Sequence, residues 1–305
     1  MEDLIVDIDL GRQGQVVNKR DDILLVDADT LVFATCATLA TESGVLPRHM
    51  YSDYEWDKIT SDAGYFEDDG VICSIDLEEA FSHSYDKLQG MLDETGCSDY
   101  ELHFTRGRDN FRYTKVSRDY KGNRTGRPPY GLGMLKDMWS KAYPDKVFQH
   151  YEFEADDIVV AKKKLNPDKY LLASVDKDVL NTLEGEAFNY YSSSLYDIPM
   201  KFIYTPAIDA LTWHYKQVIM GDAGDNVIGI KGMGKVKTAR LFKDVTTHKE
   251  CWDIVVKLFE DEKTILKDGR DASIIDAITN MRLVNMHQLH YIDGKWEVIL
   301  WKPEF

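Results

Sequence analysis

The sequence lacks the patterns that would place it in several common classes of protein. No apolar run approaches the ~20 residues of a membrane-spanning helix, and the acidic N-terminus MEDLIVDIDL does not resemble a signal peptide. The four cysteines are scattered without a Cys-x-x-Cys pair, which favours reduced thiols in a cytoplasmic protein. Nucleophile-elbow, P-loop and dinucleotide fingerprints are also missing. We therefore expect no membrane partner and none of these chemistries.

Positive charge is scarce in the chain as a whole but not locally. The net charge is −16, which by itself argues against a nucleic-acid partner. Residues 106–127 nevertheless contain eight basic and only two acidic residues, and residues 231–243 contain five basic residues and no acidic one. Two segments of the chain could therefore contact a phosphate backbone.

Strand and helix patterns alternate in the first two thirds of the chain. Apolar or alternating stretches at 23–26, 99–106, 146–151 and 169–175 predict strands. Helical patterns at about 77–95, 130–142 and 154–165 predict an α/β fold with a mainly parallel sheet flanked by helices. After about residue 205 the pattern predicts short helices and a hairpin that turns at Asp293-Gly294. We expect an N-terminal arm over 1–20, an α/β core over 21–204 and a helical region over 205–305.

Acidic residues gather where these strands end or where helices begin. They follow the first strand, the third strand (EADD), the fourth strand (SVDKD) and a later helix (GDAGDN). The full set is Asp27, Glu154, Asp156, Asp157, Asp176, Asp178, Asp222 and Asp225. Because ligands of parallel α/β sheets bind at the carboxyl ends of the strands, we expect these side chains to meet at one edge.

Each acidic cluster has an ordinary explanation when it is taken alone. Acids in a first helical turn cap the helix and interact with its dipole, which is worth about 0.3–1 kcal/mol each. Taken together, so many like charges cannot all ionise at one edge without a cation. Oxygen ligands suit Mg²⁺ or Mn²⁺, and two such ions about 3.5–4 Å apart support in-line phosphoryl displacement. The histidines show no zinc spacing, and His287 and His290, expected on one helix, favour a structural role.

The stretch FRYTKVSRDYKGNRTGRPP (111–129) combines basic and aromatic residues. Basic residues recur at every third position, at Arg112, Lys115, Arg118, Lys121 and Arg124. A helix would place them along one face, and a loop could also present them. Tyr113 and Tyr120 add surfaces that suit stacking on single-stranded nucleic acid. Such runs are usually solvated surface, but the acidity of the rest of the chain weighs against that explanation.

The same stretch resembles the basic element of the structure-specific 5′-nucleases, the flap endonuclease family. EADD, SVDKDVL and GDAGDNVIGIKGMGKVKTA follow in the family's order and at similar spacing. The last of these resembles its helix–three-turn–helix, here at about 218–245. The resemblance covers about residues 22–245, and the chain looks most like the compact bacteriophage 5′→3′ exonucleases of the family. It implies a PIN-like nuclease core, with the segment 106–129 as an arch.

The resemblance implies a role for each matching residue. The ligands near the attacking water would be Asp27, Glu154, Asp156, Asp157 and Asp176. A second ion, or the first through water, would be served by Asp178, Asp222 and Asp225. Lys121 and Arg124 would contact the scissile phosphate, and Tyr120 would stack on a base near the 5′ end. Further DNA contacts are expected from Arg112, Lys115, Arg118, Arg127, Gly232, Gly234, Lys235 and Lys237.

The Gly-x-Gly turn in GIKGMGKVKTA (229–239) is weak evidence by itself, because such a turn commonly just connects two helices. Gly232 and Gly234 permit a tight turn that brings backbone N–H groups to a phosphate at the start of the next helix. Lys235 and Lys237 add charge, so the element is expected to hold a duplex backbone without reading its sequence. In the family a K⁺ ion is often held by carbonyls of this turn, and the resemblance admits one here.

One position departs from the family. Where its second strand usually ends in an aspartate, this chain has Thr105. Either Asp109 or Asp29 compensates, or the site has one ligand fewer. The two-ion inventory therefore stays open at this corner of the site.

The resemblance implies a Mg²⁺-dependent 5′→3′ exonuclease or flap endonuclease that leaves 5′-phosphates, with Mn²⁺ able to substitute. The expected partners are DNA with a free 5′ end, nick or flap, and the RNA of hybrids, in replication, primer removal and recombination. We expect a cytoplasmic monomer. One alternative is a PIN-type ribonuclease, which shares the acidic edge but generally lacks the turn module at 221–239. Another is a non-catalytic duplex-binding protein, which would not need eight acids at one edge.

Overall fold

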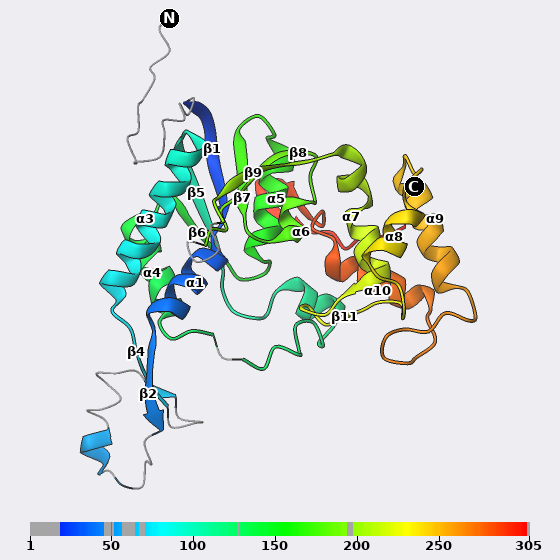
Figure 1. The fold of residues 1–305 in the computed structure, drawn as a ribbon. Helices are drawn as coiled ribbons and strands as arrows, with labels where there is room; N and C mark the ends of the chain where they lie inside the picture. The colour runs from blue at the N-terminus through cyan, green and yellow to red at the C-terminus, as the bar shows by residue number, and fades with distance from the viewer. Residues whose placement is uncertain are drawn as a thin grey trace, which may run out of the picture. The chain divides into compact units, whose positions relative to one another are not determined.

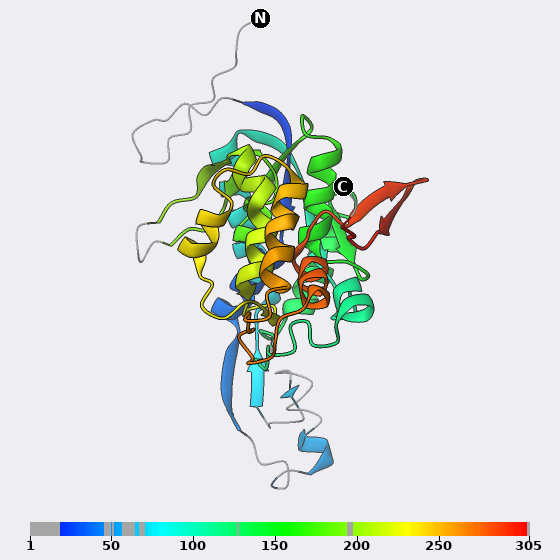
Figure 2. The same cartoon turned by 90° about the vertical axis from the view of Figure 1, so that its right-hand side faces the viewer.

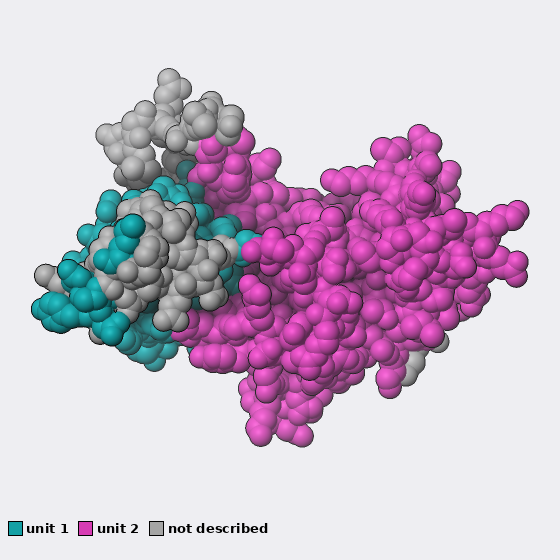
Figure 3. All heavy atoms as spheres, turned by 90° about the horizontal axis from the view of Figure 1, so that it is seen from below, with its two compact units in different colours: residues 1–19, 28–96, 126–148 teal, residues 20–27, 97–125, 149–305 magenta. Residues whose placement is uncertain are grey.

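The computed structural model of the protein describes residues 19–45, 50, 52–56, 65–66, 71–126, 128–193 and 198–303. The chain forms two compact units, coloured separately in Figure 3. Unit 1 comprises residues 1–19, 28–96 and 126–148, and unit 2 comprises residues 20–27, 97–125 and 149–305. The boundary expected near residue 205 therefore falls inside unit 2. The arm expected over 1–20 lies outside the described residues, apart from its last two.

Unit 1 contains helices α1, α3 and α4 and a small sheet in the order β2-β4-β3. The bounds are α1 Asp29–Leu39, β2 Thr41–Val45, β3 Tyr65–Phe66, β4 Val71–Ser74, α3 Leu77–Thr95 and α4 Leu132–Ala142. Asp76 caps the start of α3 by accepting from the N–H of Glu78 at 2.9 Å, and Gly96 ends it in the left-handed region. Trp139 is fully buried beside Phe81 and joins α4 to α3.

Most of the central sheet belongs to unit 2, and its strand order is β6-β5-β1-β7-β8-β9. The bounds are β1 Arg20–Asp27, β5 Cys97–Thr105, β6 Val147–His150, β7 Tyr170–Ser174, β8 Gly185–Asn189 and β9 Lys201–Thr205. β1 pairs in parallel with β5 and β7, β7 pairs in parallel with β8, and β9 is antiparallel to β8. The prediction of a mainly parallel sheet is confirmed. The carboxyl ends of β5, β1 and β7 consequently lie at one edge.

Helices α5 (Ala155–Leu165) and α6 (Lys177–Leu180) pack on this sheet, as Figure 1 shows. Ile158 and Val159 of α5 are buried with Leu25 of β1 and Leu172 of β7 in one apolar cluster. This packing fixes the start of α5 relative to the ends of the strands. The acidic residues that open α5 therefore have a rigid support.

A second apolar cluster joins the helices of the C-terminal third. The elements are α7 Ala207–Met220, β10 Gly221–Asp222, β11 Val227–Ile228, α8 Lys235–Leu241, α9 His248–Phe259 and α10 Ile274–Val284. Val218, Val255 and Met281 are buried where α7, α9 and α10 meet (Figure 1). A Cβ on Gly221 would lie 2.4 Å from the carbonyl oxygen of Val227, so the turn after α7 requires glycine.

The chain continues into a hairpin of β12 (Leu289–Ile292) and β13 (Lys295–Val298), drawn in red in Figure 2. Asp293 and Gly294 both have positive φ, as a two-residue hairpin turn of this kind requires. The predicted hairpin is confirmed. The expectation that His287 and His290 share a helix is wrong, because α10 ends at Val284 and His290 lies in β12.

All four cysteines are buried thiols outside any disulfide of the described residues, as the sequence predicted. Among the described residues, no helix combines the length and the apolarity that crossing a bilayer demands.

Candidate metal centre and its basic loop

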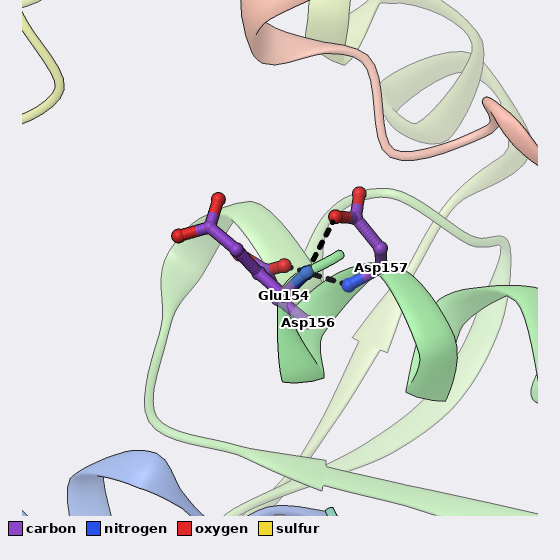
Figure 4. A group of neighbouring side chains, drawn as sticks. All are labelled: Glu154, Asp156 and Asp157. Atoms are coloured by element: carbon purple, nitrogen blue, oxygen red, sulfur yellow. Dashed lines mark hydrogen bonds between the residues drawn. The ribbon is translucent and has the colours of Figure 1, made fainter. Parts of the chain in front are cut away.

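Three carboxylates converge at the start of α5, and we call Glu154, Asp156 and Asp157 the acidic helix group. Each offers an oxygen that lies within 4.8 Å of those of the other two. Figure 4 shows how the first turn arranges them. The N–H of Glu154 donates to Asp157 Oδ2 at 3.2 Å, and the N–H of Asp157 donates to Asp156 Oδ1 at 2.6 Å. These bonds show that the acids cap the helix, as the ordinary explanation expects. Capping alone does not require three carboxylates to lie so close together.

Arg112 compensates the acidic helix group from within the protein. Its two terminal nitrogens donate to the two oxygens of Asp157, both at 2.6 Å, and one also reaches Glu154 at 3.2 Å. Its Nε donates to the carbonyl of Leu283 at 2.7 Å, and the residue is only 2 % exposed. The expected DNA contact of Arg112 is therefore wrong, because its guanidinium is buried and its donors are used inside the protein.

Residues 119–124, here called the basic loop, lie against the turn that carries Asp222 and Asp225. The N–H of Lys121 donates to the carbonyl of Asp225 at 3.1 Å. Asn123 donates to the carbonyl of Ala223 at 2.5 Å, and Asn226 donates to the carbonyl of Asp119 at 2.9 Å. The basic residues do not form one helical face, because the π-helical turn Arg112–Val116 ends before this loop. The loop alternative therefore holds from residue 117 onward.

The basic loop carries two cations to the acids. Lys121 Nζ lies 2.5 Å from Glu154 Oε1 and 3.9 Å from Asp225 Oδ1. Arg124 donates to Asp225 Oδ1 at 2.7 Å and to the carbonyl of Gly224 at 3.0 Å. Burial alone would lower the pKa of Lys121, but the charges of Glu154 and Asp225 raise it above its usual value. Lys121 therefore remains a cation beside the acidic helix group.

Tyr120 does not present a ring to solvent. It is 5 % exposed, and its hydroxyl donates to Glu154 Oε2 at 2.7 Å and to Asp225 Oδ2 at 3.1 Å. The expected stacking of Tyr120 on a base is therefore wrong, because the ring is buried in the apolar cluster of the C-terminal helices. Its hydroxyl instead links the two sets of acids.

Asp178, Asp222 and Asp225 form the second set, which we call the acidic loop group. Lys177 Nζ lies 3.2 Å from Asp222 Oδ2 but 3.7 Å from Asp178 Oδ1, which is beyond hydrogen-bond distance. Asp178 Oδ1 is buried and has no hydrogen-bond partner among the described residues. Burial and the charge of Asp176 raise the pKa of Asp178 to about 7. This group is thus less fully compensated than the acidic helix group.

One small cavity brings members of both sets together. Asp156, Asp178, Asp222 and Asp225 line it together with Arg112 and Tyr120, and its volume is about 20 Å³. Burial and the charges of Asp157 and Glu154 raise the pKa of Asp156 well above its usual value. Burial would also raise the pKa of Glu154, but Lys121 and Arg112 hold it at about 2. Arg112 and Lys121 offset only part of this rise, so Asp156 is the least compensated acid of its group.

Asp27 and Asp176 meet through a hydroxyl that the sequence analysis did not consider. Ser174 Oγ donates to Asp27 Oδ2 at 2.9 Å and accepts from the N–H of Asp176 at 3.0 Å. Asp176 also caps α6 by accepting from the N–H of Asp178 at 2.8 Å. Neither Asp27 nor Asp176 is among the described residues that line the cavity. A buried serine that ends a strand beside two aspartates was the available signal.

Thr105 takes a structural role at the position where the family has an aspartate. Its Oγ1 accepts from the N–H of Ala155 at 2.8 Å and so ties the end of β5 to the start of α5. Asp109 is exposed, and Asp29 lies in unit 1 with Lys136 Nζ at 2.6 Å. Among the described residues, neither of the two lines the cavity.

The remaining expected DNA contacts are mostly at the surface of unit 2. Lys115, Arg118, Lys235 and Lys237 are exposed, and Arg118 packs over the ring of Tyr113 at 4.7 Å. Gly232 has a φ of 76°, whereas Gly234 caps α8 with a φ of −107°. Apart from its own chain neighbours, no atom of the described residues lies within 4 Å of a Cβ built on either glycine. Arg127 lies outside the described residues.

The fold defines a mixed α/β protein with acids gathered at one edge of a mainly parallel sheet. No protein-family model and no curated protein sequence matches the chain. Solved structures that share the fold include a mutant of the T5 5′-exonuclease and the T5 D15 protein co-crystallised with metal ions. The first has a TM-score of 0.53 at 17 % identity, over 88 % of this chain and 89 % of that one. The second has a TM-score of 0.51 at 17 % identity, over 87 % and 90 %. The family resemblance is confirmed at the level of the fold.

Proposed function

We propose that this protein is a Mg²⁺-dependent 5′-nuclease that hydrolyses phosphodiesters of DNA, and of RNA in hybrids, leaving 5′-phosphates. The observation that carries the proposal is the cavity lined by Asp156, Asp178, Asp222 and Asp225, with Lys121 and Arg124 beside it. Its four carboxylates, and an Asp178 Oδ1 that accepts no hydrogen bond from any described residue, fit a hard divalent cation. The fold shared with the T5 5′-exonuclease, and with the T5 D15 protein co-crystallised with metal ions, points the same way.

The acids of the site take different roles in this proposal. Asp156 and the acidic loop group hold the divalent ions, with Glu154 beside them, and Asp27 and Asp176 complete the edge through Ser174. Asp157 holds Arg112 and binds no metal, because both of its oxygens already accept from the guanidinium. The site has one ligand fewer than the family pattern, because Thr105 stands in place of an aspartate and its Oγ1 accepts a hydrogen bond from the N–H of Ala155.

Bound Mg²⁺ supplies an activated water and neutralises the charge that develops on the phosphate. Lys121 keeps its charge and is positioned by Glu154, so its ammonium can contact a phosphate oxygen from the basic loop. Arg124 is half exposed and shares Asp225 with Tyr120, which leaves guanidinium donors for the same phosphate. The exposed Lys115 and Arg118 guide the 5′ strand toward these residues.

The duplex side of the substrate is held elsewhere in this proposal. The turn at 229–234 approaches the phosphate backbone, and Lys235 and Lys237 at the start of α8 add positive charge. The open space around Gly232 and Gly234 leaves room for that approach. The K⁺ ion that the resemblance admits at this turn stays a prediction, as do the roles in replication and recombination.

A nuclease assay on the EDTA-treated full chain tests the proposal. A 5′-labelled flap, a nicked duplex, a blunt duplex and single-stranded RNA are incubated with and without Mg²⁺. We expect Mg²⁺-dependent cleavage of DNA near the 5′ end and a loss of about 100-fold or more in Asp156→Asn. Asp253→Asn, an exposed aspartate of α9 paired with Lys249, is the matched control and should keep its activity.

Two outcomes of this assay would contradict the proposal. Cleavage of the single-stranded RNA alone would favour the PIN-type ribonuclease. Tight duplex binding without cleavage in either Mg²⁺ or Mn²⁺ would favour a non-catalytic binding protein. Loss of both cleavage and DNA binding in Asp156→Asn would count against its assignment as a metal ligand.

A further inference from the structure

A glutamine on α7 shares the cavity with the four aspartates. Gln217 lines it together with Asp156, Asp178, Asp222 and Asp225. It lies one helical turn before the end of α7, five residues ahead of Asp222. Its neighbours Val218 and Ile219 are fully buried in the apolar cluster of the C-terminal helices. Nothing in the motifs of the sequence had singled this residue out.

The amide oxygen of Gln217 is buried without a partner. The residue is 4 % exposed, and its Oε1 makes no hydrogen bond to any described residue. Leaving such an acceptor unsatisfied costs about 1–3 kcal/mol. Five buried side-chain atoms of the described chain share this condition, and the two that belong to cavity-lining residues are Gln217 Oε1 and Asp178 Oδ1. Both are oxygen acceptors, so neither can satisfy the other while Asp178 is ionised.

We propose that Gln217 Oε1 is a neutral oxygen ligand of the divalent cation held by the acidic loop group. The inference rests on the proposed function, since it extends the donor set of the same site. A cavity needs about 10–15 Å³ to hold one water-sized particle, and this one has about 20 Å³. A carbonyl oxygen is an accepted ligand for Mg²⁺, Mn²⁺ and Ca²⁺. It adds a ligand without adding a fifth negative charge to the four aspartates.

A single ordered water is the competing occupant. It could donate one hydrogen bond to Gln217 Oε1 and one to Asp178 Oδ1 and so satisfy both acceptors. The two occupants make different predictions when the side chain at position 217 changes. A carboxylate oxygen at this position attracts a cation more strongly than an amide oxygen does. If the glutamine only holds a water, Gln217→Met leaves cation affinity unchanged, and a carboxylate at this position acts on the cation only through space.

The test is a Mn²⁺ titration of the EDTA-treated full chain at fixed pH, followed by electron paramagnetic resonance and calorimetry, without substrate. We compare Gln217→Met, which keeps the length of the side chain, and Gln217→Glu, which keeps the oxygen and adds charge. We expect Met to weaken one class of Mn²⁺ site by about 10–100-fold and Glu to tighten it. Circular dichroism confirms the fold of each variant, and if Met fails to fold, unchanged or weaker Mn²⁺ affinity in Gln217→Glu overturns the inference.

Unchanged Mn²⁺ affinity in Gln217→Met, or weaker affinity in Gln217→Glu, would overturn the inference while the wild type still binds Mn²⁺. If the wild type binds no Mn²⁺ at all, the proposed function itself is wrong. The two failures are therefore distinguishable in one experiment.

Discussion

The acidic helix group and the acidic loop group are both clusters of carboxylates, but the protein neutralises them differently. The first has Arg112, which is 2 % exposed, and Lys121, which the basic loop positions against Glu154. The second has Lys177 and Arg124, whose side chains are 58 % and 56 % exposed. One set of acids is thus balanced by cations built into the fold. The other is balanced by cations that solvent also reaches.

This difference indicates which carboxylates stabilise the fold and which remain available to bind a ligand. Removing one partner of a buried ion pair destabilises the fold strongly, because the other charge is left buried alone. An exposed ion pair contributes only about 0–1 kcal/mol to the stability of the fold. Asp156 is the exception within its group, because Arg112 and Lys121 offset its charge only in part and it lines the shared cavity. Asp156 therefore resembles the acidic loop group, whose carboxylates remain available to a ligand, although it comes from the same helical turn as Asp157.

The largest expected effect on stability comes from breaking the buried ion pair between Arg112 and Asp157. Arg112→Ala leaves Asp157 buried without its cation, and removal of one partner of such a pair typically costs about 3–5 kcal/mol. Urea unfolding of the metal-free protein measures the change. Arg124→Ala, on the exposed side, is the control and should change the free energy of unfolding by no more than about 1 kcal/mol. Equal losses in both variants would mean that the two groups do not differ as described.

A smaller effect, on the rate of cleavage, is expected when the partly exposed cation Lys121 is removed from the site. Lys121→Ala should lower the rate of cleavage by about 100–1000-fold, the usual cost of losing a group that stabilises developing charge. DNA affinity should fall only a few-fold, because Lys115 and Arg118 remain. Single-turnover kinetics and anisotropy separate the two quantities. Lys249→Ala is the matched control, since Lys249 is exposed and pairs with Asp253 away from the basic loop. An unchanged cleavage rate in Lys121→Ala would remove its role at the phosphate.

Local sequence predicted much of the fold and the position of the acids. The strands expected at 23–26 and 169–175 correspond to β1 and β7, and the helix expected at 77–95 is α3. The rule that ligands bind at the carboxyl edge correctly brought Asp156 and Asp178 to one place. β8 and β9 were not foreseen, because neither has a long apolar or alternating run.

The sequence could not predict which charged and aromatic residues of the basic stretch become buried. Arg112 meets Asp157 across 45 residues of chain, and Tyr120 meets Asp225 across 105. Burial of this kind depends on tertiary pairing and leaves no local pattern, so the three-residue repeat could not show which of its residues become buried. Gln217 was missed for the same reason, since its cavity exists only after α6, α7 and α10 pack together.

Glu101, a carboxylate outside the site, makes the stability of the fold depend on pH. Glu101 on β5 pairs with Lys162 and His103, and although burial would raise its pKa, these partners lower it to about 2. A lowered pKa in the folded state contributes stability above the unfolded value near 4.5, and this stability is lost as the pH falls toward 2. The wild type should therefore exceed Glu101→Gln by about 2 kcal/mol at pH 6, and the difference should shrink by pH 3. Urea unfolding across this range measures it, and a constant difference would contradict the assigned compensation.

The smallest effect is expected from the exposed lysines that serve DNA rather than acids. Lys235 lies at the start of α8, so Lys235→Ala should weaken duplex binding uniformly and reduce the slope of log affinity against log salt by about 1. Anisotropy between 50 and 200 mM salt, in EDTA so that no cleavage occurs, gives this slope. Lys249→Ala is the control, because that lysine is equally at the surface but pairs with Asp253 at 2.7 Å. A slope that changes alike in both variants would mean that α8 does not contact the backbone and that only net charge matters. A slope that changes in Lys235→Ala alone would indicate that the duplex contacts the turn beside α8. It would also distinguish lysines that contact DNA from lysines that only pair with carboxylates.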